Sequence, residues 1–204
     1  MQKRVLCTIH IWQRMFEILL RNIQNKISLT EAEKEICTSF FTAKKLRKKQ
    51  YFLQEGDVCK YLAFVEKGAL RSYTIDEKGA EHILQFALEN WWISDMYSFY
   101  TQLPGTYTID ALEDSEILLI TLADFEKMLL EVPKMERYIR ILLQNNLIAS
   151  NNRMSCSLTF TAEQKYYKFT ESFPDIFNRV PQHMIASFLG FTKETLSRIR
   201  SKKV

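Results

Sequence analysis

Apolar residues recur at two different spacings along this 204-residue chain. Helical spacing of three and four residues runs through residues 9–25, 122–130 and 134–157, where the apolar side chains share one face of each predicted helix. Between about Lys44 and Ile120 the apolar residues fall instead in short extended runs, each bounded by a turn signal such as Glu55-Gly56-Asp57. This middle part is therefore predicted to be an antiparallel sandwich or barrel.

Six strands are predicted in the middle part, over residues 51–53, 61–65, 70–75, 82–87, 107–112 and 116–120. Further helices are predicted on both sides of it. Thr30 with Glu33, and Thr161 with Gln164, form capping boxes, in which paired side chains satisfy free backbone N–H groups at a helix start. Pro174 is predicted to end the second of these helices, and residues 156–160 form the predicted linker before it.

The segment 134–157 carries the longest helical pattern in the chain. Its apolar positions recur at Met135, Ile139, Leu142, Leu143, Leu147 and Ala149. A helix of about 24 residues spans about 36 Å, which is longer than a small domain needs to cover its own core. The pattern predicts a helix that pairs with its copy in a homodimer. An ordinary packed helix remains the alternative, because asparagines interrupt the heptads at Asn145, Asn146, Asn151 and Asn152.

Two short helical segments around Gly190 lie at the end of the chain. The first begins near Pro181, Gly190 supplies the turn, and Thr192 can cap the second. The face that holds the two helices together is apolar, with Ile185, Ala186, Leu189, Leu196 and Ile199. Four side chains are predicted to point outward: Lys193, Glu194, Ser197 and Arg198. The arrangement predicts a helix-turn-helix that enters a DNA groove; a solvated helical hairpin is the alternative.

The positive charge of the chain is concentrated in this last segment. Residues 179–204 hold six basic residues and one acid, a net charge of +5, whereas the whole chain is +4, so residues 1–178 carry about −1. A local basic surface is what binding to phosphates requires. A second basic run, Lys44 to Lys49, is interpreted as a solvated edge that discourages aggregation, with DNA contact as the alternative.

Composition and motifs argue against several other classes of protein. No stretch approaches the about 18 uninterrupted apolar residues of a membrane span, and no signal-peptide pattern opens the chain, so we expect a soluble, cytoplasmic protein. The cysteines at 7, 37, 59 and 156 are too widely spaced for a zinc or iron–sulfur motif and are expected to be reduced thiols. The β part holds one histidine, His82, and the chain has no catalytic motif. We therefore expect no enzyme activity, no metal site and no cofactor.

The order of short helix, glycine-punctuated β part, long helix and helix-turn-helix resembles the cyclic-AMP receptor protein/Fnr family of bacterial transcription regulators, from about Leu29 onward. Phe191 to Arg198 is similar to the recognition-helix motif of that family, and residues 55–57, 67–71, 89–95 and 111–115 are similar to its branch common in Bacteroidetes. The resemblance implies an α+β fold. Its parts would be an N-terminal antiparallel β-roll of the cyclic-nucleotide-binding, jelly-roll type with flanking helices, a long dimerisation helix, and a C-terminal winged-helix-type helix-turn-helix domain.

The implied boundaries are 1–28 for an N-terminal helical extension, 29–132 for the sensor domain, 133–157 for the dimerisation helix and 158–204 for the DNA-binding domain. The resemblance places Lys193, Glu194 and Arg198 at base edges. Lysine and arginine can donate to guanine, and glutamate can accept from cytosine. The remaining implied contacts are to the DNA backbone: Gln182, His183, Thr192, Thr195 and Ser197.

The sensor part departs from members of the family that bind cyclic nucleotides. Their cassette has Gly-Glu near its beginning and Arg-Ser or Arg-Thr at its end; here Ser94-Asp95 and Gly105-Thr106 stand at those positions. No lysine or arginine occurs from Ile83 to Asp124, so a buried cyclic phosphate would lack a cationic partner and cyclic AMP is expected not to bind. An aromatic-rich stretch beside the cassette is interpreted as core, with an effector pocket as the alternative. The pocket candidates are Trp91, Trp92, Asp95, Tyr97 and Thr106.

The sequence thus predicts a homodimeric, sequence-specific regulator of transcription that binds double-stranded DNA at an inverted-repeat operator. RNA polymerase is a further partner implied by the resemblance, and a small-molecule effector of unknown identity is expected in the sensor. The alternative is a signalling module that binds a cyclic nucleotide or another small molecule and for which DNA binding is secondary.

Overall fold

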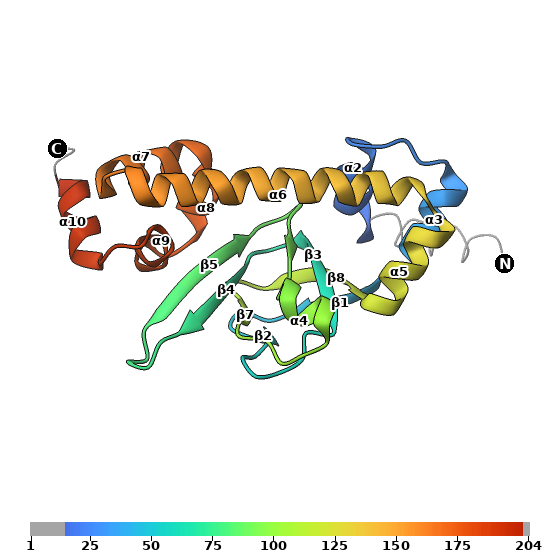
Figure 1. The fold of residues 1–204 in the computed structure, drawn as a ribbon, viewed down its shortest axis with the longest axis horizontal. Coiled ribbons are helices and arrows are strands. Elements are labelled where there is room, and N and C mark those ends of the chain that lie inside the picture. The colour runs from blue at the N-terminus through green and yellow to red at the C-terminus, as the bar shows by residue number, and fades with distance from the viewer. Residues whose placement is uncertain (1–14, 202–204) are drawn as a thin grey trace.

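Two four-stranded antiparallel sheets form the β part in the computed structural model, which describes residues 15–201 (Figure 1). One sheet has the strand order β1-β8-β3-β6 and the other β2-β7-β4-β5. The strands are β1 (Thr42–Leu46), β2 (Tyr51–Leu53), β3 (Tyr61–Lys67), β4 (Leu70–Ile75), β5 (Glu81–Ala87), β6 (Trp92–Ile93), β7 (Thr108–Ala111) and β8 (Ser115–Thr121). The predicted antiparallel β-roll is confirmed.

Two of these strands were not predicted from the sequence. Strand β1 contains the first cations of the basic run and lies at the outer edge of its sheet, where it pairs with β8. Lys44 and Lys45 are exposed and only Leu46 is buried, so the strand lacks the alternation of a half-buried strand. Its position agrees with the interpretation of this run as a solvated edge. Strand β6 has only two residues, too few for a periodic pattern.

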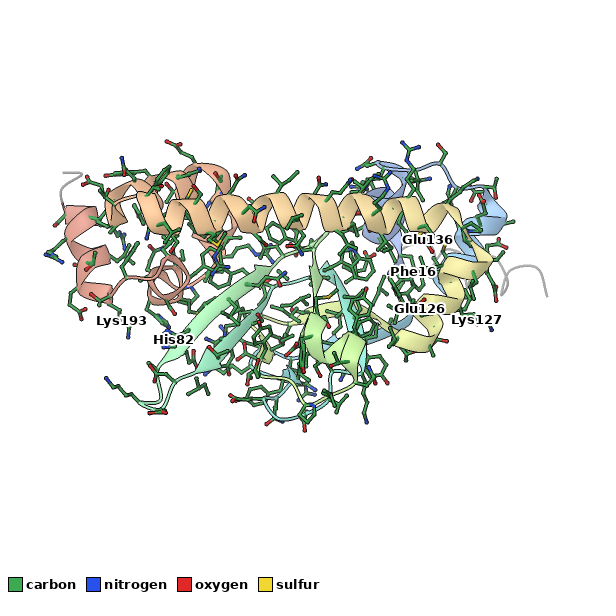
Figure 2. The ribbon with its side chains drawn as sticks, in the orientation of Figure 1. Phe16, His82, Glu126, Lys127, Glu136 and Lys193 are labelled. Atoms are coloured by element: carbon green, nitrogen blue, oxygen red, sulfur yellow. The ribbon has the colours of Figure 1, made fainter. Side chains whose placement is uncertain are left out.

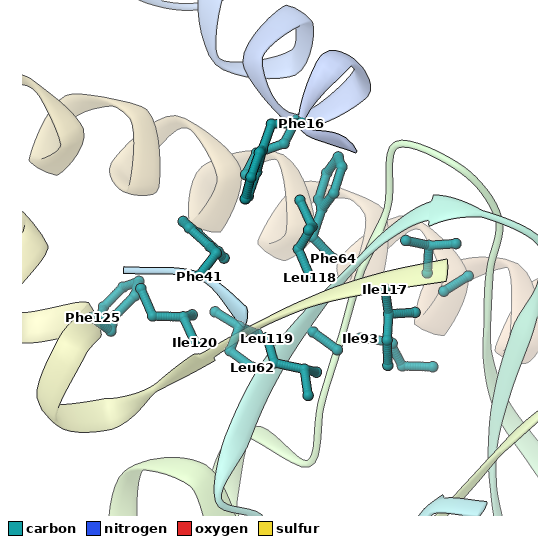
Figure 3. Close-up of a cluster of buried hydrophobic side chains, with 14 of the residues drawn as sticks. Phe16, Phe41, Leu62, Phe64, Ile93, Ile117, Leu118, Leu119, Ile120 and Phe125 are labelled. Carbon is teal, nitrogen blue, oxygen red and sulfur yellow. The ribbon is translucent and has the colours of Figure 1, made fainter. Parts of the chain in front are cut away.

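Helices α2 (Glu17–Gln24), α3 (Glu31–Ser39), α4 (Met96–Thr101) and α5 (Leu122–Glu131) flank the sheets. The Thr30–Glu33 capping box is confirmed, since Glu33 N donates to Thr30 Oγ1 and Thr30 N donates to Glu33 Oε2 at 2.7 Å. Phe16, Phe41, Phe64 and Phe125 meet in one core that joins these helices to the β1–β8–β3 sheet (Figure 3). The part of the predicted first helix before residue 15 lies outside the described residues.

Helix α6 (Lys134–Thr159) has 26 residues and runs along the length of the molecule (Figure 1). At 1.5 Å per residue it is about 39 Å long. Its N-terminal half is anchored to the β part. Tyr138 is buried, donates to Asn22 Oδ1 at 2.9 Å and accepts from Trp92 Nε1 at 3.1 Å. The helix continues through most of the predicted linker, so the break between α6 and the next helix is confined to Phe160 and Thr161.

Four helices follow: α7 (Ala162–Ser172), α8 (Pro174–Arg179), α9 (Gln182–Leu189) and α10 (Lys193–Ser201). Helix α8 was not predicted, because Pro174 was interpreted only as a terminator; it also occupies the first turn of the next helix, where a missing N–H costs nothing. Between residues 161 and 201 the structure contains no strand. Helices α9 and α10 form the predicted helix-turn-helix. The β-strand wing implied by the resemblance is not found between residues 161 and 201.

Candidate nucleic-acid interface

Helices α9 and α10 meet at a tight turn that Gly190 makes. Gly190 has φ of +75°, a left-handed conformation that is strained for other residues, and the next N–H, of Phe191, returns to the carbonyl of Ala186 at 3.1 Å. Thr192 then caps α10, because its Oγ1 accepts from Thr195 N at 3.3 Å. The turn at Gly190 and the cap at Thr192 are those that the sequence predicted.

One face of α10 holds the helix in place and the other is open to solvent. Leu196 and Ile199 are buried in a small apolar cluster with Tyr166 and Ala186. The opposite face carries exposed side chains, which are Lys193, Glu194, Ser197 and Arg198. All four residues predicted to point outward do so, and they offer donors and one acceptor suited to base edges.

Within this face, two charged side chains bond to their own helix. The pKa of Glu194 is lowered because its own backbone N–H, and then the Thr192 hydroxyl, donate to the carboxylate. Arg198 Nη2 donates to Thr195 Oγ1 at 3.2 Å. Glu194 and Arg198 are both exposed, so each bond can be exchanged for one to a partner molecule. Lys193 is exposed at the start of the helix.

The residues predicted to contact the DNA backbone differ in accessibility. His183, Thr192 and Ser197 are exposed, and Thr195 is half-buried. Gln182 is half-buried; its Nε2 donates to Phe177 O at 3.4 Å and its Oε1 is buried without a partner among the described residues. Gln182 would therefore have to rotate to reach a phosphate.

Arg179, counted with the basic segment in the sequence, does not belong to this face. Its guanidinium binds Glu89 in a bidentate pair, at 2.6 and 3.0 Å, and also contacts Glu113. Both glutamates lie in the β part, 90 and 66 residues away in sequence. Arg179 thus ties the C-terminal helices to the sensor domain rather than supplying charge for phosphate binding.

The two domains also share an apolar cluster, which includes the chain neighbours of this ion pair, Leu88 and Val180. The β part contributes Ala69, Tyr73, Ile83, Phe86 and Leu88, and the C-terminal helices contribute Phe169, Ile176, Val180 and Ile185. All nine are buried. The orientation of the helix-turn-helix in this conformation is therefore fixed by packing against the β4–β5 hairpin.

The free edge of strand β5 is covered by polar side chains from the helices. Ser187 Oγ accepts from Ile83 N at 3.1 Å and donates to Glu81 O at 2.8 Å. Arg153 of α6 donates to Leu84 O and lies 4.2 Å above the ring of Phe188. These contacts satisfy the backbone groups that an edge strand leaves open, and they join α6, α9 and the hairpin into one unit.

The Arg179 ion pair predicts acid-sensitive stability. Burial acts to raise the pKa of Glu89, but hydrogen bonds from Arg179 and from the N–H of Gly68 outweigh it, so the pKa is lowered. Because the pKa of Glu89 is lower in the folded than in the unfolded protein, ionisation of Glu89 stabilises the fold. This contribution is present above the unfolded pKa of about 4.3 and is lost as the pH falls through the folded pKa. We expect Arg179→Gln to lower the free energy of unfolding by about 1 kcal/mol at pH 7 and by less at pH 3.5.

Urea unfolding at the two pH values measures this difference. The matched control is Arg21→Gln, which removes an arginine from an exposed pair with Glu17 and should change the free energy of unfolding little at either pH. Equal destabilisation by Arg179→Gln at pH 7 and pH 3.5 would contradict the assignment.

In the sensor domain, a carboxylate of the protein itself fills the cassette turn where a cyclic phosphate would need donors. Asp95 is 1% exposed; its Oδ1 accepts from Ser98 N at 3.0 Å, and its Oδ2 from Thr106 N at 3.1 Å. A Cβ on Gly105 would lie 2.6 Å from Asp95 Oδ2, so a larger residue there would disturb this bond. The turn is thus closed by an internal anion, which repels a second anion.

The other effector-pocket candidates form no common site with Asp95 and Thr106. Trp92 packs against Phe64 at 5.0 Å between ring centroids and points toward α6. Trp91 contacts Phe173 of the C-terminal domain, and Tyr97 is 61% exposed. Asp95 and Thr106 are the two candidates that the structure joins by a hydrogen bond.

Sequence reasoning missed one buried cation, Arg71 on β4. Its guanidinium binds Asp110 at 2.8 and 3.0 Å, contacts Glu81, and lies 4.2 Å from the centroid of the Tyr73 ring. Arg71 lies before residues 83–124, the interval without lysine or arginine, and its place next to Leu70 in a predicted strand was the available signal. Because two carboxylates already neutralise it, Arg71 is not available to bind a phosphate without breaking both pairs.

The C-terminal half of α6 leaves a row of apolar side chains exposed. Of the residues predicted for the dimer face, Met135 is buried, and Ile139 and Leu142 pack partly against the β core. Leu143, Leu147 and Ala149, also predicted for this face, are exposed. Leu143 and Leu147 lie within about 60° around the helix of two residues that were not predicted, Met154 and Leu158, and these four are 51–81% exposed. This row extends over residues 143–158, which is more than half the length of the helix.

Four further observations concern the rest of the described residues. Among residues 15–201, no group of three His, Cys, Asp or Glu side chains could hold a metal ion, and no helix is long and apolar enough to cross a membrane. Cys37 is buried, and burial, with a smaller effect of Glu33, raises its pKa to about 12, which makes the thiol unreactive. His82 is largely exposed and lies 2.9 Å from Asp76.

Comparison with known proteins relates both the fold and the sequence to regulators. Residues 43–131 match the family model of the cyclic nucleotide-binding domain. The regulatory protein HlyX of Actinobacillus pleuropneumoniae is 26% identical over 210 residues, which cover 96% of this chain and 84% of HlyX. The fumarate and nitrate reduction regulatory protein of Vibrio cholerae is 24% identical over 84% of this chain and 73% of its own length.

Solved structures show the same fold. FixK2 from Bradyrhizobium japonicum has a TM-score of 0.67 and 20% identity, and the match covers 79% of this chain and 83% of FixK2. The global regulator CLP of Xanthomonas campestris has a TM-score of 0.70 and 13% identity over 85% and 91% of the two chains. HlyX, the Vibrio cholerae protein and CLP are regulators by name. By its fold, its domain match and its relatives, the chain is similar to the cyclic-AMP receptor protein/Fnr family of transcription regulators.

Proposed function

We propose that this protein is a homodimeric, sequence-specific DNA-binding regulator of transcription that reads an inverted-repeat operator with helix α10. The observation that carries the proposal is the division of α10 into two faces. Leu196 and Ile199 fix the helix to the domain, and Lys193, Ser197 and Arg198 are exposed on the other side. A short, rigidly held helix with an exposed basic face is suited to the major groove.

The exposed apolar row on α6 supports a second copy of the chain as the partner. A two-fold axis along this helix would place two α10 helices in one dimer, and their half-sites would be about 34 Å apart, one turn of DNA. Such a dimer reads an inverted repeat, because the protein and the operator then share their symmetry. RNA polymerase is proposed as a further partner on family resemblance.

Selection from a random duplex library tests the DNA-reading proposal without knowledge of the regulated genes. The expected product is an inverted repeat with half-site centres about 10 base pairs apart. Enrichment of a single, asymmetric half-site would contradict binding by a dimer. No enrichment at all would contradict sequence-specific binding. Weakening of the selected complex with rising salt would reveal the phosphate contacts.

A cyclic-nucleotide module is the second candidate function, and the match of residues 43–131 to the cyclic nucleotide-binding domain favours it. The internal pairing of Asp95 with Thr106 N, and the neutralised state of Arg71, oppose it. We expect calorimetric titration with cyclic AMP to give no binding heat at concentrations up to about 1 mM. A dissociation constant of about 1 mM corresponds to a binding free energy of about −4.1 kcal/mol. Binding in the micromolar range would restore the cyclic-nucleotide candidate.

A further inference from the structure

His183 lies in the first turn of α9 and is open to solvent. Its side chain is exposed, and no described residue forms a hydrogen bond or ion pair with it. Helix α9 begins after Pro181 without a side-chain cap, so no side chain satisfies its first N–H groups. Free N–H groups at a helix start favour a phosphate, and the ring of a histidine in that turn can add a further donor. The proposed contact of His183 to the DNA backbone therefore has a physical basis in the fold.

Charged and titratable side chains from two neighbouring elements share a hollow with His183. The β4–β5 hairpin contributes Glu81 and His82, and α10 contributes Lys193. Figure 2 shows His82 and Lys193 at the same end of the molecule. Of the described residues that line this hollow, none comes from α7 or α8, the helices that lead into α9. Lys193 repels a second positive charge in the hollow, so only a negative group can favour one there.

The carboxylates of the hairpin are already paired with groups other than His183. Glu81 is bound by Arg71. Asp76, in the hairpin turn, accepts from two backbone N–H groups of that turn at 2.9 Å and lies 2.9 Å from His82 Nε2. The free protein thus offers no unpaired carboxylate in the hollow to a charged imidazole of His183. A DNA phosphate at the start of α9 would be the first anion to do so.

We propose that His183 takes up a proton when the protein binds DNA, so that affinity for the operator rises as the pH falls. The proposal rests on the DNA-binding function proposed above and assigns a regulation to the same surface. Histidine is the side chain that ordinarily changes charge between pH 5 and 8. A phosphate stabilises the charged ring through a charge-assisted hydrogen bond. Because the complex then holds more protons than the free partners, linkage makes association tighter at lower pH.

Fluorescence anisotropy with the selected duplex at pH 8 and pH 6, at equal ionic strength, measures this coupling. We expect the affinity of the wild-type protein to rise by about 10-fold, about threefold from each of two half-sites. His183→Gln cannot bind a proton and should remove the rise. His183→Lys carries its charge at both pH values, so it should bind more tightly than His183→Gln at both and also show no rise.

His82→Gln is the matched control, because His82 lines the same hollow but is paired with Asp76. This variant should keep the rise of the wild-type protein. If the affinity of His183→Gln still rises by about 10-fold, the proton is not taken up at His183 and the proposal is wrong. Loss of the rise in His82→Gln, with His183→Gln like wild type, would overturn it equally.

A mixed-sequence duplex of the same length separates this proposal from the proposed function. Phosphate contacts do not depend on base sequence, so the wild-type protein should show a rise of the same sign on this duplex even if selection finds no operator. Calorimetry in two buffers of different ionisation enthalpy counts the protons. We expect net proton uptake by the wild-type protein at pH 7 and none by His183→Gln. Specific binding without proton uptake would overturn this proposal alone and leave the proposed function standing.

Discussion

Replacing Lys193 and Arg198 together by alanine will reduce affinity for the selected operator by at least about 100-fold. Each side chain is exposed on the α10 face, and a good contact from a basic side chain to a base edge is worth about 1–3 kcal/mol. Two such contacts in each half-site are four per dimer and correspond to at least about 4 kcal/mol, which exceeds the about 2.8 kcal/mol of a 100-fold change. Fluorescence anisotropy with a labelled duplex at fixed salt measures the change.

The matched control for this double variant is Lys44→Ala/Arg47→Ala. It removes the same number of charges from exposed positions on and just after β1, at the other side of the molecule from α10 (Figure 1). We expect it to change operator affinity by less than about threefold, through long-range electrostatics alone. If the two double variants weaken binding equally, the basic run of residues 44–49 contacts DNA and the assignment of α10 as the reading helix is wrong.

Leu147→Glu will convert the protein from a dimer to a monomer. Leu147 lies in the exposed apolar row of α6 and is 63% exposed in the single chain, so a charge there is tolerated by the monomer. In a dimer, by contrast, two glutamates would be buried face to face without partners. Sedimentation equilibrium should give about half the wild-type mass. Operator affinity should fall by about 100-fold or more, because two linked half-sites become independent.

Asn145→Glu is the control for this variant, since residue 145 is exposed and lies on the other side of α6 from Leu147, about 200° away around the helix. It should leave both the mass and the operator affinity unchanged. A dimeric Leu147→Glu with wild-type affinity would show that α6 does not form the interface. Circular dichroism of both variants checks that the monomer is still folded.

Most of the architecture could be predicted because its signals are local. Gly190, Thr192 and the capping box at Thr30 act within four residues of themselves, and their structures agree with prediction. Strand β1 was missed because cations on an exposed edge have no apolar alternation. Helix α8 was missed because one proline both ends a helix and begins the next.

The site was less predictable where it depends on contacts distant in sequence. Arg179 looked like part of the basic face, and only the fold shows that Glu89 and Glu113 neutralise it. The sequence indicated that the cassette lacks a cation, but it did not indicate that Asp95 closes the turn through Thr106 N. In each case the pairing partner is set by strand order and turn geometry, which no spacing of residue types encodes.

The central claim, a dimer that reads DNA sequence through α10, is tested most directly by one comparison of affinities. The selected duplex and a shuffled duplex of the same composition are titrated with wild-type protein at physiological salt, with stoichiometry measured in parallel. We expect two chains per duplex and binding to the selected site at least about 10³-fold tighter than to the shuffled one. Equal affinity for the two duplexes, whatever its magnitude, would contradict the claim.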